Sequence, residues 1–469
     1  MNRGRFARVS GIAILAMLVG TLGATEAWAH PRGNHSRHCA GLDRLQVPGA
    51  QHQEAACLDD LTTAGTVNTG HTVPADFAGL NAPGTVNPSG VPGIQIDGYF
   101  PDTSTFNTNH GWNHDAQFVI RLPDRWNGGI VITGAPGART QYANDLIIAD
   151  TVLAKGYAFA STDKGNNGPE FYTDGDRPGD AVVEWNERVT ELTRATRAVA
   201  KQRYRAHPKH TLLFGISNGG YLVRWQLENH PELYDGGLDW EGTLFSTDDS
   251  LLTYLPAALR NYPVYAAGGA GAQEAHQAML DAGFEPGTEY LWPFHYAYYW
   301  DFTQRTFREE FDPEWDGALQ AGIPFCASGT PNCDADYDVS TRPMAREAIA
   351  RVALTGRIGK PLITVHGTHD ALLPISLHGD AYDALVDQAG RGRLHRYYRF
   401  EGGTHVDSLQ PYYPDQIRPL LPCARTGFDA LEQWVGSDRP GRGRRVPPPP
   451  DATLARPADG DPVTGCSLT

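Results

Sequence analysis

The chain has few cysteines and lacks the motifs of the common nucleotide and cofactor sites. Six cysteines occur in 469 residues, and no two are spaced as C-x-x-C, which gives little support to a redox or zinc-ribbon protein. No G-x-x-x-x-G-K-S/T sequence occurs, no dinucleotide-binding glycine motif follows a first strand, and no internal repeat is found. The sequence therefore implies neither a nucleotide nor a cofactor.

Long apolar runs and positive charge are also scarce. Residues 1–29 combine a basic start, a short apolar run and Ala-Trp-Ala before His30, which predicts a cleaved export signal; an uncleaved anchor is the alternative. No later segment approaches 18 uninterrupted apolar residues, so we expect no stable membrane insertion. Without residues 1–29 the chain has 36 basic and 53 acidic side chains, a formal charge of −17, which argues against nucleic acid as a partner. We expect a secreted protein, and the sequence does not indicate its oligomeric state.

All six cysteines lie outside the predicted signal segment. An even number of cysteines in an exported chain suggests three disulfides, and six cysteines allow fifteen pairings. Proximity along the chain favours Cys39–Cys57, Cys326–Cys333 and Cys423–Cys466.

Strand-like and helix-like patterns alternate in residues 111–242 and 346–440. Apolar runs such as GGIVITGA and HTLLFGIS are each followed by a segment with helical periodicity. This alternation predicts an α/β fold with a mostly parallel central sheet and helices on both faces. Ligands of such sheets bind at the carboxyl ends of the strands.

The remaining segments differ in composition. Residues 30–110 are rich in Gly, Pro, Thr, Asn and His and are expected to form a loop-rich arm. Residues 243–345 interrupt the alternation with the aromatic stretch YLWPFHYAYYWDF and are expected to form an inserted lid. Residues 441–469 are rich in Pro and Arg and predict an extended surface tail. One catalytic domain with an insertion and two extensions is the simplest account.

Ser217 lies in the stretch LLFGISNGGYLVRW, between an apolar strand-like run and a helix-like segment. A nucleophilic serine on a sharp strand-to-helix turn needs small neighbours two residues away on either side, and Gly215 and Gly219 meet that need. The G-x-S-x-G pattern in this context predicts a nucleophile. A serine in an ordinary turn is the alternative.

Asp370 and His405 follow two later strand-like runs, in LITVHGTHD and FEGGTHVD. A serine hydroxyl needs a base, and the order Ser217, Asp370, His405 is that of hydrolases whose triad follows the order Ser, acid, His. We predict His405 as the general base and Asp370 as the acid that orients it. Asp239 and Glu241, which follow the next strand-like run after Ser217, are rival positions for the acid.

An oxyanion hole needs backbone N–H groups aimed at the developing charge. The N–H of Asn218, directly after the predicted nucleophile, is one expected donor. The other should come from the loop GAPGART, residues 134–140. Pro136 has no N–H, so Ala135 is the first candidate and Gly134 the second; a plain Gly/Pro turn is the alternative.

His366 and His369 form an H-x-x-H sequence at the end of a strand-like run. Strand-end spacing lacks the ligand geometry of a helical H-x-x-x-H pair, and no third ligand is evident. We interpret both as ordinary polar residues and predict no metal site.

These motifs resemble those of the α/β-hydrolases: HGTHDALLP is similar to the family's acid loop and GGTHVD to its histidine loop. The segments GVPGIQIDGYFPD, RLPDRWNGGIVITGAPG and GYAFASTDKGNNG resemble secreted tannase and feruloyl-esterase-like hydrolases, and also hydrolases of 3-hydroxybutyrate oligomers. The resemblance implies a serine esterase that cleaves carboxylic esters of phenolic or hydroxy acids. One feature departs from the tannase group, whose serine and histidine are flanked by bridged cysteines: Ile216 and Val406 stand there instead.

The predicted lid carries the aromatic residues Tyr290, Trp292, Phe294, Tyr296, Tyr298, Tyr299 and Trp300. They could line an acyl or aromatic pocket, with Trp292, Tyr296 and Tyr299 as substrate contacts, or they could form the core of the lid itself. A serine aminopeptidase or amidase of the same fold is the alternative function. Asp248, Asp249 or Glu241 would then hold the substrate's ammonium group.

Overall fold

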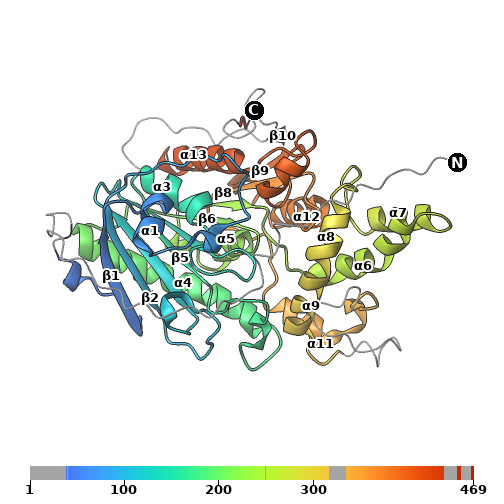
Figure 1. Ribbon diagram of the computed structural model, residues 1–469, viewed down its shortest axis with the longest axis horizontal. Helices are drawn as coiled ribbons and strands as arrows, with labels where there is room; N and C mark the ends of the chain where they lie inside the picture. Colours follow the sequence, from blue (N-terminus) through green and yellow to red (C-terminus); the bar gives the residue numbers. More distant parts are fainter. Residues whose placement is uncertain are drawn as a thin grey trace.

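A ten-stranded sheet runs through the protein in the order β1-β2-β3-β5-β4-β6-β7-β8-β9-β10 (Figure 1). The structure is a computed structural model that describes residues 39, 41–248, 250–315, 334–437, 452–455 and 466–468. The strands are β1 (His52–Leu58), β2 (Gly93–Tyr99), β3 (Gln117–Pro123), β4 (Gly129–Gly134), β5 (Ala158–Thr162), β6 (His210–Ile216), β7 (Gly236–Trp240), β8 (Leu362–Gly367), β9 (His395–Phe400) and β10 (Ala452–Ala455).

Strands β5, β4, β6, β7, β8, β9 and β10 pair in parallel, whereas β1, β2, β3 and β5 pair antiparallel. Every residue of β4 and β8 is buried, as their nearly continuous apolar sequences require. The mostly parallel sheet predicted from the sequence is confirmed.

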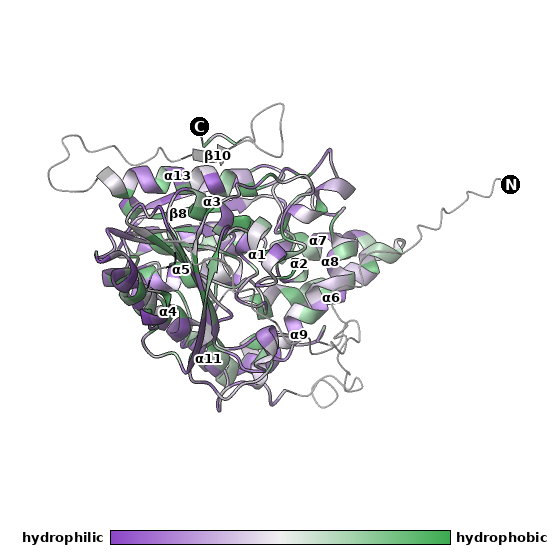
Figure 2. Ribbon diagram, turned by 60° about the vertical axis from the view of Figure 1, so that its left-hand side comes forward, coloured by the Kyte–Doolittle hydropathy of each residue, from purple (hydrophilic) through white to green (hydrophobic). Residues whose placement is uncertain are grey.

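Helices cover both faces of the sheet. Helices α3 (Asp150–Ala154) and α13 (Leu421–Ser437) lie along one face and α4 (Asp180–Tyr204) along the other, where it packs against α5 (Asn218–Asn229) (Figures 1 and 2). The buried side chains of α4 recur every three or four residues, which turns one stripe of this long helix toward the sheet. Helix α1 (Thr63–Thr69) packs on β1 and α12 (Ile375–Gln388) on β8 and β9, whereas α11 (Pro343–Ala350) packs against α9; α2 spans Pro74–Phe77. The layered arrangement is that of an α/β-hydrolase.

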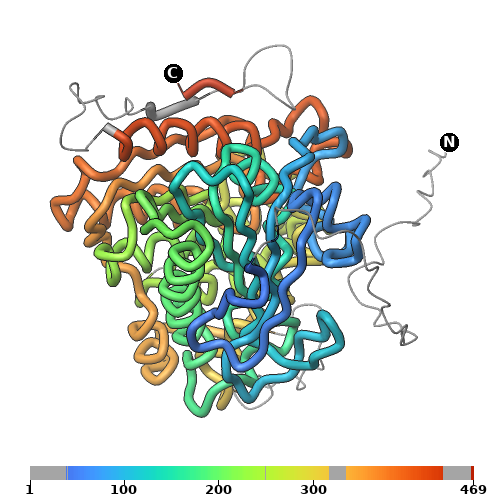
Figure 3. Tube along the Cα trace, turned by 90° about the vertical axis from the view of Figure 1, so that its left-hand side faces the viewer, coloured from blue at the N-terminus to red at the C-terminus, as the bar shows by residue number. Residues whose placement is uncertain are grey.

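The amino-terminal segment holds more regular structure than its composition predicts. Within residues 30–110, β1 and β2 pair with each other and β2 pairs with β3, so both belong to the main sheet (Figure 3). Gly98 explains part of the misleading composition, because a Cβ there would lie 2.4 Å from the carbonyl oxygen of His52 on the neighbouring strand. Some of the glycines thus serve close strand pairing rather than loops.

In the described part of the predicted lid, helices α6 (Leu251–Ala267), α7 (Ala272–Asp281), α8 (Trp292–Tyr298) and α9 (Trp300–Phe311) stand beside the sheet (Figure 1). Helix α6 packs against α7, α8 and α9. The boundaries proposed for the lid stay predictions. The expected Cys326–Cys333 bridge, Asp249 and residues 1–29 lie outside the described residues.

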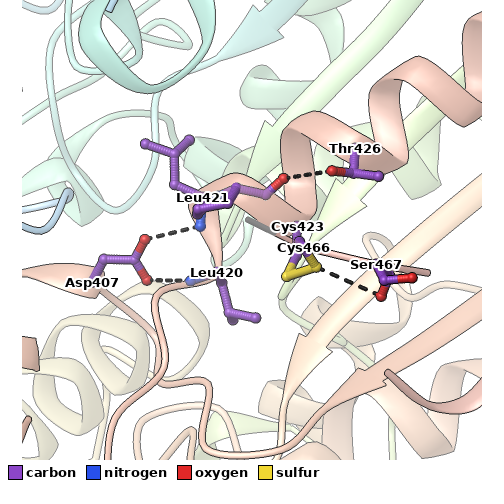
Figure 4. The surroundings of a disulfide bond; sticks show 8 residues. Asp407, Leu420, Leu421, Cys423, Thr426, Cys466 and Ser467 are labelled. Carbon is purple, nitrogen blue, oxygen red and sulfur yellow. Dashed lines mark hydrogen bonds between the residues drawn. A yellow bond between two sulfur atoms is a disulfide. The ribbon is translucent and has the colours of Figure 1, made fainter. Parts of the chain in front are cut away.

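Two of the three predicted disulfides are formed, Cys39–Cys57 and Cys423–Cys466. Cys423 lies in the first turn of α13, and Cys466 attaches the carboxyl-terminal tail to it (Figure 4). Within the tail, β10 pairs in parallel with β9, which adds a strand to the edge of the sheet. Among the helices of the described residues, none is long and apolar enough to cross a membrane.

Candidate active site

Ser217 occupies the sharp turn between β6 and α5. Its backbone angles, φ 58° and ψ −123°, lie in a region that non-glycine residues rarely adopt. A Cβ on Gly215 would lie 2.2 Å from the carbonyl oxygen of Gly219, and one on Gly219 would lie 2.7 Å from that of Gly134. The turn therefore needs glycine at both positions, and it leaves Ser217 partly exposed at the end of the sheet.

His405 connects Ser217 to Asp370. Its Nε2 lies 3.0 Å from Oγ of Ser217, and its Nδ1 lies 2.7 Å from Oδ2 of Asp370. His405 is 8% exposed and Asp370 1% exposed, so the three side chains form a chain of hydrogen bonds that is largely shielded from water. The structure thus brings together three residues that are 188 and 35 positions apart in the sequence.

The loop after β8 fixes the carboxylate of Asp370. Its Oδ1 accepts hydrogen bonds from the backbone N–H groups of Leu372 and Leu373, both at 2.8 Å. Burial raises the pKa of Asp370, but the interactions with His405 and with these donors outweigh burial and hold the pKa below its ordinary value. Asp370 is therefore ionised and oriented toward His405.

The lid helices hold the same loop from the other side. Leu244 N–H donates to Nδ1 of His378, so the proton of His378 is on Nε2, 2.9 Å from the Tyr254 hydroxyl. That hydroxyl donates to the carbonyl oxygen of Leu372 at 2.8 Å. The Trp300 indole donates to the carbonyl oxygen of Ala371, also at 2.8 Å. The position of the acid loop thus depends on α6 and α9.

The two rival acids occupy different environments. Asp239 forms a buried ion pair with Arg224 at 2.7 Å and accepts a hydrogen bond from Thr364. These two interactions hold its carboxylate within the sheet. Glu241, in contrast, lies beside the histidine, with Oε2 4.0 Å from Nδ1 of His405. Asp370 is the carboxylate in hydrogen-bond contact with His405.

His366 and His369 also lie near this loop. His366 is fully buried and its Nε2 contacts the carbonyl oxygen of Leu373 at 2.9 Å; burial lowers its pKa to about 4. Nδ1 of His369 lies 3.1 Å from the Tyr290 hydroxyl. Both act as polar packing groups, and neither joins a cluster of potential metal ligands in the described part of the chain.

Among the residues that the structure describes, two clusters of side chains have the spacing that a metal ion would need. One is Glu241, Asp370 and His405 itself. The other is Asp102, Asp174 and Glu184, which line a cavity of about 630 Å³. Arg188 lies in this cavity and forms ion pairs with Asp102 and Glu184, so the cluster already has a counter-charge.

The predicted oxyanion donors differ in whether their N–H groups already have a partner, and Ala135 is contradicted. The N–H of Ala135 donates to the carbonyl oxygen of Thr162 at 2.9 Å, as a continuation of the β4–β5 pairing, so it is not free for an oxyanion. Asn218 is the first residue of α5, where the N–H has no partner inside the helix. Its side chain donates to the carbonyl oxygen of Gly137 at 3.3 Å, which ties the loop after β4 to the turn.

The lid aromatics divide between core and surface. Trp292 is fully buried and bonds Thr288 through its indole, so the structure favours a packing role for it over a substrate contact. Tyr296 is half-buried and packs against Tyr262, with the two ring centroids 4.7 Å apart. Tyr299 is also half-buried. Burial raises the pKa of its hydroxyl, and the positive charge of Arg139, in the loop after β4, opposes this shift.

His295, His378 and Tyr254 were not identified from the sequence as site residues. His295 lies on α8, and burial lowers its pKa to about 4, whereas the negative charge of Asp370 acts to raise it. The relation of His378 and Tyr254 to the acid loop depends on lid packing, for which the sequence carries no motif. No sequence pattern distinguishes these three residues from the other histidines and tyrosines of the chain.

Part of the chain, and its fold, are similar to known proteins. Residues 103–240 match the family model described as tannase and feruloyl esterase, and no curated protein matches the chain. An esterase from Aspergillus oryzae is 13% identical with a TM-score of 0.52, over 85% of this chain and 89% of that chain. Feruloyl esterase B from Aspergillus oryzae is 12% identical with a TM-score of 0.48, over 77% and 82% of the two chains. Tannin acyl hydrolase from Aspergillus niger is 14% identical with a TM-score of 0.45, over 83% and 89%.

The likeness to the Aspergillus oryzae esterase supports the fold, and the family match indicates a carboxylic-ester hydrolase. The resemblance to hydrolases of 3-hydroxybutyrate oligomers stays a prediction. The chain has the α/β-hydrolase fold, and its residues 103–240 match the tannase and feruloyl esterase family model.

Proposed function

We propose that this protein is a secreted serine esterase in which Ser217 is the nucleophile, His405 the general base and Asp370 the acid that orients His405. The observation that carries the proposal is the pair of contacts made by the His405 ring, 3.0 Å to Ser217 and 2.7 Å to Asp370. Asp370 keeps the imidazole proton on Nδ1, so Nε2 is the atom free to accept a proton.

Hydrolysis would proceed in two half-reactions. His405 Nε2 removes the hydroxyl proton of Ser217 as Oγ attacks the ester carbonyl carbon, and the same proton then passes to the departing alcohol. A water molecule next gives a proton to Nε2 as its oxygen attacks the acyl carbon, and the proton returns to Oγ as the free acid leaves. Asp370 stabilises the imidazolium formed in each half-reaction.

Two backbone N–H groups are proposed for the oxyanion. One is that of Asn218, at the start of α5. The other is the N–H of Gly137, which follows Pro136 and has φ 52°; this N–H donates no hydrogen bond within the described residues. A Cβ at Gly137 would meet nothing within 4 Å, as expected for a residue beside open space.

The proposed substrates are carboxylic esters of phenolic or hydroxy acids. The family match supports the phenolic class, and the rings of Tyr296 and Tyr299 offer partly exposed surface on the lid. Two disulfides support export to an oxidising compartment. The amidase alternative receives less support. Asp248, which would hold the substrate's ammonium group, has a side chain that is 85% exposed and lies 3.6 Å from the cationic group of Arg346.

Labelling with a fluorophosphonate tests the nucleophile directly. The reagent should modify Ser217 in the wild-type protein, as identified by mass spectrometry of the labelled peptide, and His405→Ala should abolish labelling. Turnover of a feruloyl or galloyl methyl ester should then exceed that of an aminoacyl anilide. Labelling of another serine, with Ser217 unmodified, would contradict the proposal.

A further inference from the structure

Glu241 is a second buried carboxyl group beside His405. It follows β7 directly and is 0% exposed. One oxygen, Oε1, accepts a hydrogen bond from Gly367 N–H at 3.0 Å, which fixes the side chain between β7 and β8. The other oxygen, Oε2, lies 4.0 Å from Nδ1 of His405, and the side chain of Trp240 also interacts with this carboxyl group.

Glu241 and Asp370 share the same small space around Nδ1 of His405. The nearest carboxylate oxygens of the two acids and Nδ1 lie within 4.8 Å of one another. Two carboxylates so close in a dry site do not both ionise. Burial, and next the charge of Asp370, raise the pKa of Glu241 well above its ordinary value, whereas that of Asp370 is lowered. Glu241 is therefore the protonated member of the pair.

We propose that Glu241 is a reserve acid for His405: it stays protonated while Asp370 carries the charge, and it orients the imidazole when the carboxylate of Asp370 is removed. Glu241 is a positioning residue, since it would act through His405 and not on the substrate. The inference rests on the proposed function of Ser217 and His405. In the absence of Asp370, the proton of Glu241 passes to solvent and the carboxylate accepts the hydrogen bond from Nδ1–H.

The surroundings of Asp370 make two substitutions behave differently. In Asp370→Asn, the amide oxygen stays at the Oδ1 position, because Leu372 N–H and Leu373 N–H donate there. The amide NH2 group then faces Nδ1 of His405 and forces the proton onto Nε2, which removes the general base. In Asp370→Ala, nothing fills the space beside Nδ1, and Oε2 of Glu241 can approach it.

The test compares kcat of these variants in the full-length protein with one ester substrate. We expect Asp370→Asn to lower kcat about 10⁴-fold, as expected for the wrong histidine tautomer. Asp370→Ala should lower it only about 100-fold, with KM changed little, because a carboxylate still orients the histidine. Adding Glu241→Gln to Asp370→Ala should lower kcat by about a further 100-fold.

Glu310 provides a matched control for the loss of a buried glutamate. It is 2% exposed, its pKa is raised by burial, and its Oε1 accepts a hydrogen bond from Val182 N–H at 3.1 Å, as Glu241 does from Gly367. Glu310→Gln in the Asp370→Ala background should leave kcat unchanged. If Asp370→Ala does not fold, Asp370→Ser replaces it, because its hydroxyl can accept one loop N–H and is too short to reach His405.

Equal activity of Asp370→Ala and Asp370→Asn, with no additional loss on Glu241→Gln, would overturn the inference. Ser217→Ala is assayed in parallel to keep this result apart from a failure of the proposed function. An inactive Ser217→Ala together with equal Asp370 variants rejects the reserve acid alone. An active Ser217→Ala rejects the triad and the inference that rests on it.

Discussion

Asp370 holds His405 with one carboxylate oxygen and its own loop with the other. Oδ2 lies 2.7 Å from Nδ1 of His405, while Oδ1 accepts two backbone N–H groups. The imidazole is thus positioned by the backbone of the loop after β8. Whatever holds that loop in place also holds the proposed general base.

Ser217→Ala and His405→Ala should each lower kcat by at least about 1000-fold, because each removes a group that the reaction cannot replace. The free energy of unfolding should change by no more than about 0.5 kcal/mol for Ser217→Ala, since only a partly exposed hydroxyl is lost. Ester hydrolysis and urea denaturation measure the two effects. A loss below tenfold in both variants would contradict the proposed triad.

Tyr254→Phe should reduce stability and activity together. The change removes the hydroxyl that bridges His378 and the carbonyl oxygen of Leu372, leaving two buried polar groups unpaired at a cost of about 1–3 kcal/mol. Because Leu372 N–H also orients Asp370, we expect a fall in kcat of about tenfold with little change in KM. Tyr412→Phe, at a tyrosine that is 66% exposed, is the control and should change neither.

Substitutions in the lid should distinguish residues that form its core from residues that contact the substrate. Trp292→Ala removes a fully buried ring and should lower the free energy of unfolding by about 3–5 kcal/mol. Tyr299→Ala should instead lower kcat/KM for phenolic esters by about threefold to tenfold, the value of one lost aromatic contact. An unchanged kcat/KM for Tyr299→Ala would remove this residue from the proposed pocket.

Asp407 should make stability depend on pH. It follows His405 by two residues, its oxygens accept the N–H groups of Leu420 and Leu421 before and at the start of α13, and burial raises its pKa from 3.8 to about 7 (Figure 4). A carboxyl whose pKa is higher in the folded state binds its proton more tightly there than in the unfolded chain. Its contribution to stability is therefore complete below about pH 4 and is lost as the pH rises toward 7.

Asp407→Asn removes this titration, so the stability difference between wild type and variant should shift against the wild type as the pH rises from 4 to 7. The expected slope is at most about 1.4 kcal/mol per pH unit. Other buried acids contribute to both proteins and cancel in the difference. Urea unfolding at several pH values provides the measurement, and a difference that is constant with pH would contradict the raised pKa. Asp415→Asn, at an exposed carboxyl, is the control.

Strand and helix periodicity was sufficient to predict the parallel part of the sheet. Strands such as β4 and β6 carry nearly continuous apolar residues because both faces are covered, and α4 shows the helical spacing of a one-sided core contact. The antiparallel edge was not predicted. In β1 and β2 the pattern is short and lies among glycines and prolines that resemble loop sequence.

The oxyanion donor shows a different limit. Ala135 stands at the expected place in the sequence, but its N–H is taken by the pairing of β4 with β5, a contact between residues 27 positions apart. The sequence states which residues lack an N–H, as Pro136 does, but not which N–H groups the fold has already used. Gly137 became the candidate only when those partners were known.

The sequence by itself determined the turn at Ser217 and the order of the three side chains, because a strained turn needs glycines at fixed positions and these are local requirements. Tertiary structure decided which acid contacts His405. Asp239 lies within β7, and Glu241 and Asp370 follow β7 and β8, at the carboxyl ends of parallel strands, so each was a reasonable candidate from the sequence. The three acids differ in ways that spacing along the chain does not encode. The carboxylate oxygens of Glu241 and Asp370 differ by about 1 Å in their distance from Nδ1 of His405, Asp239 is paired with Arg224, and Glu241 is buried.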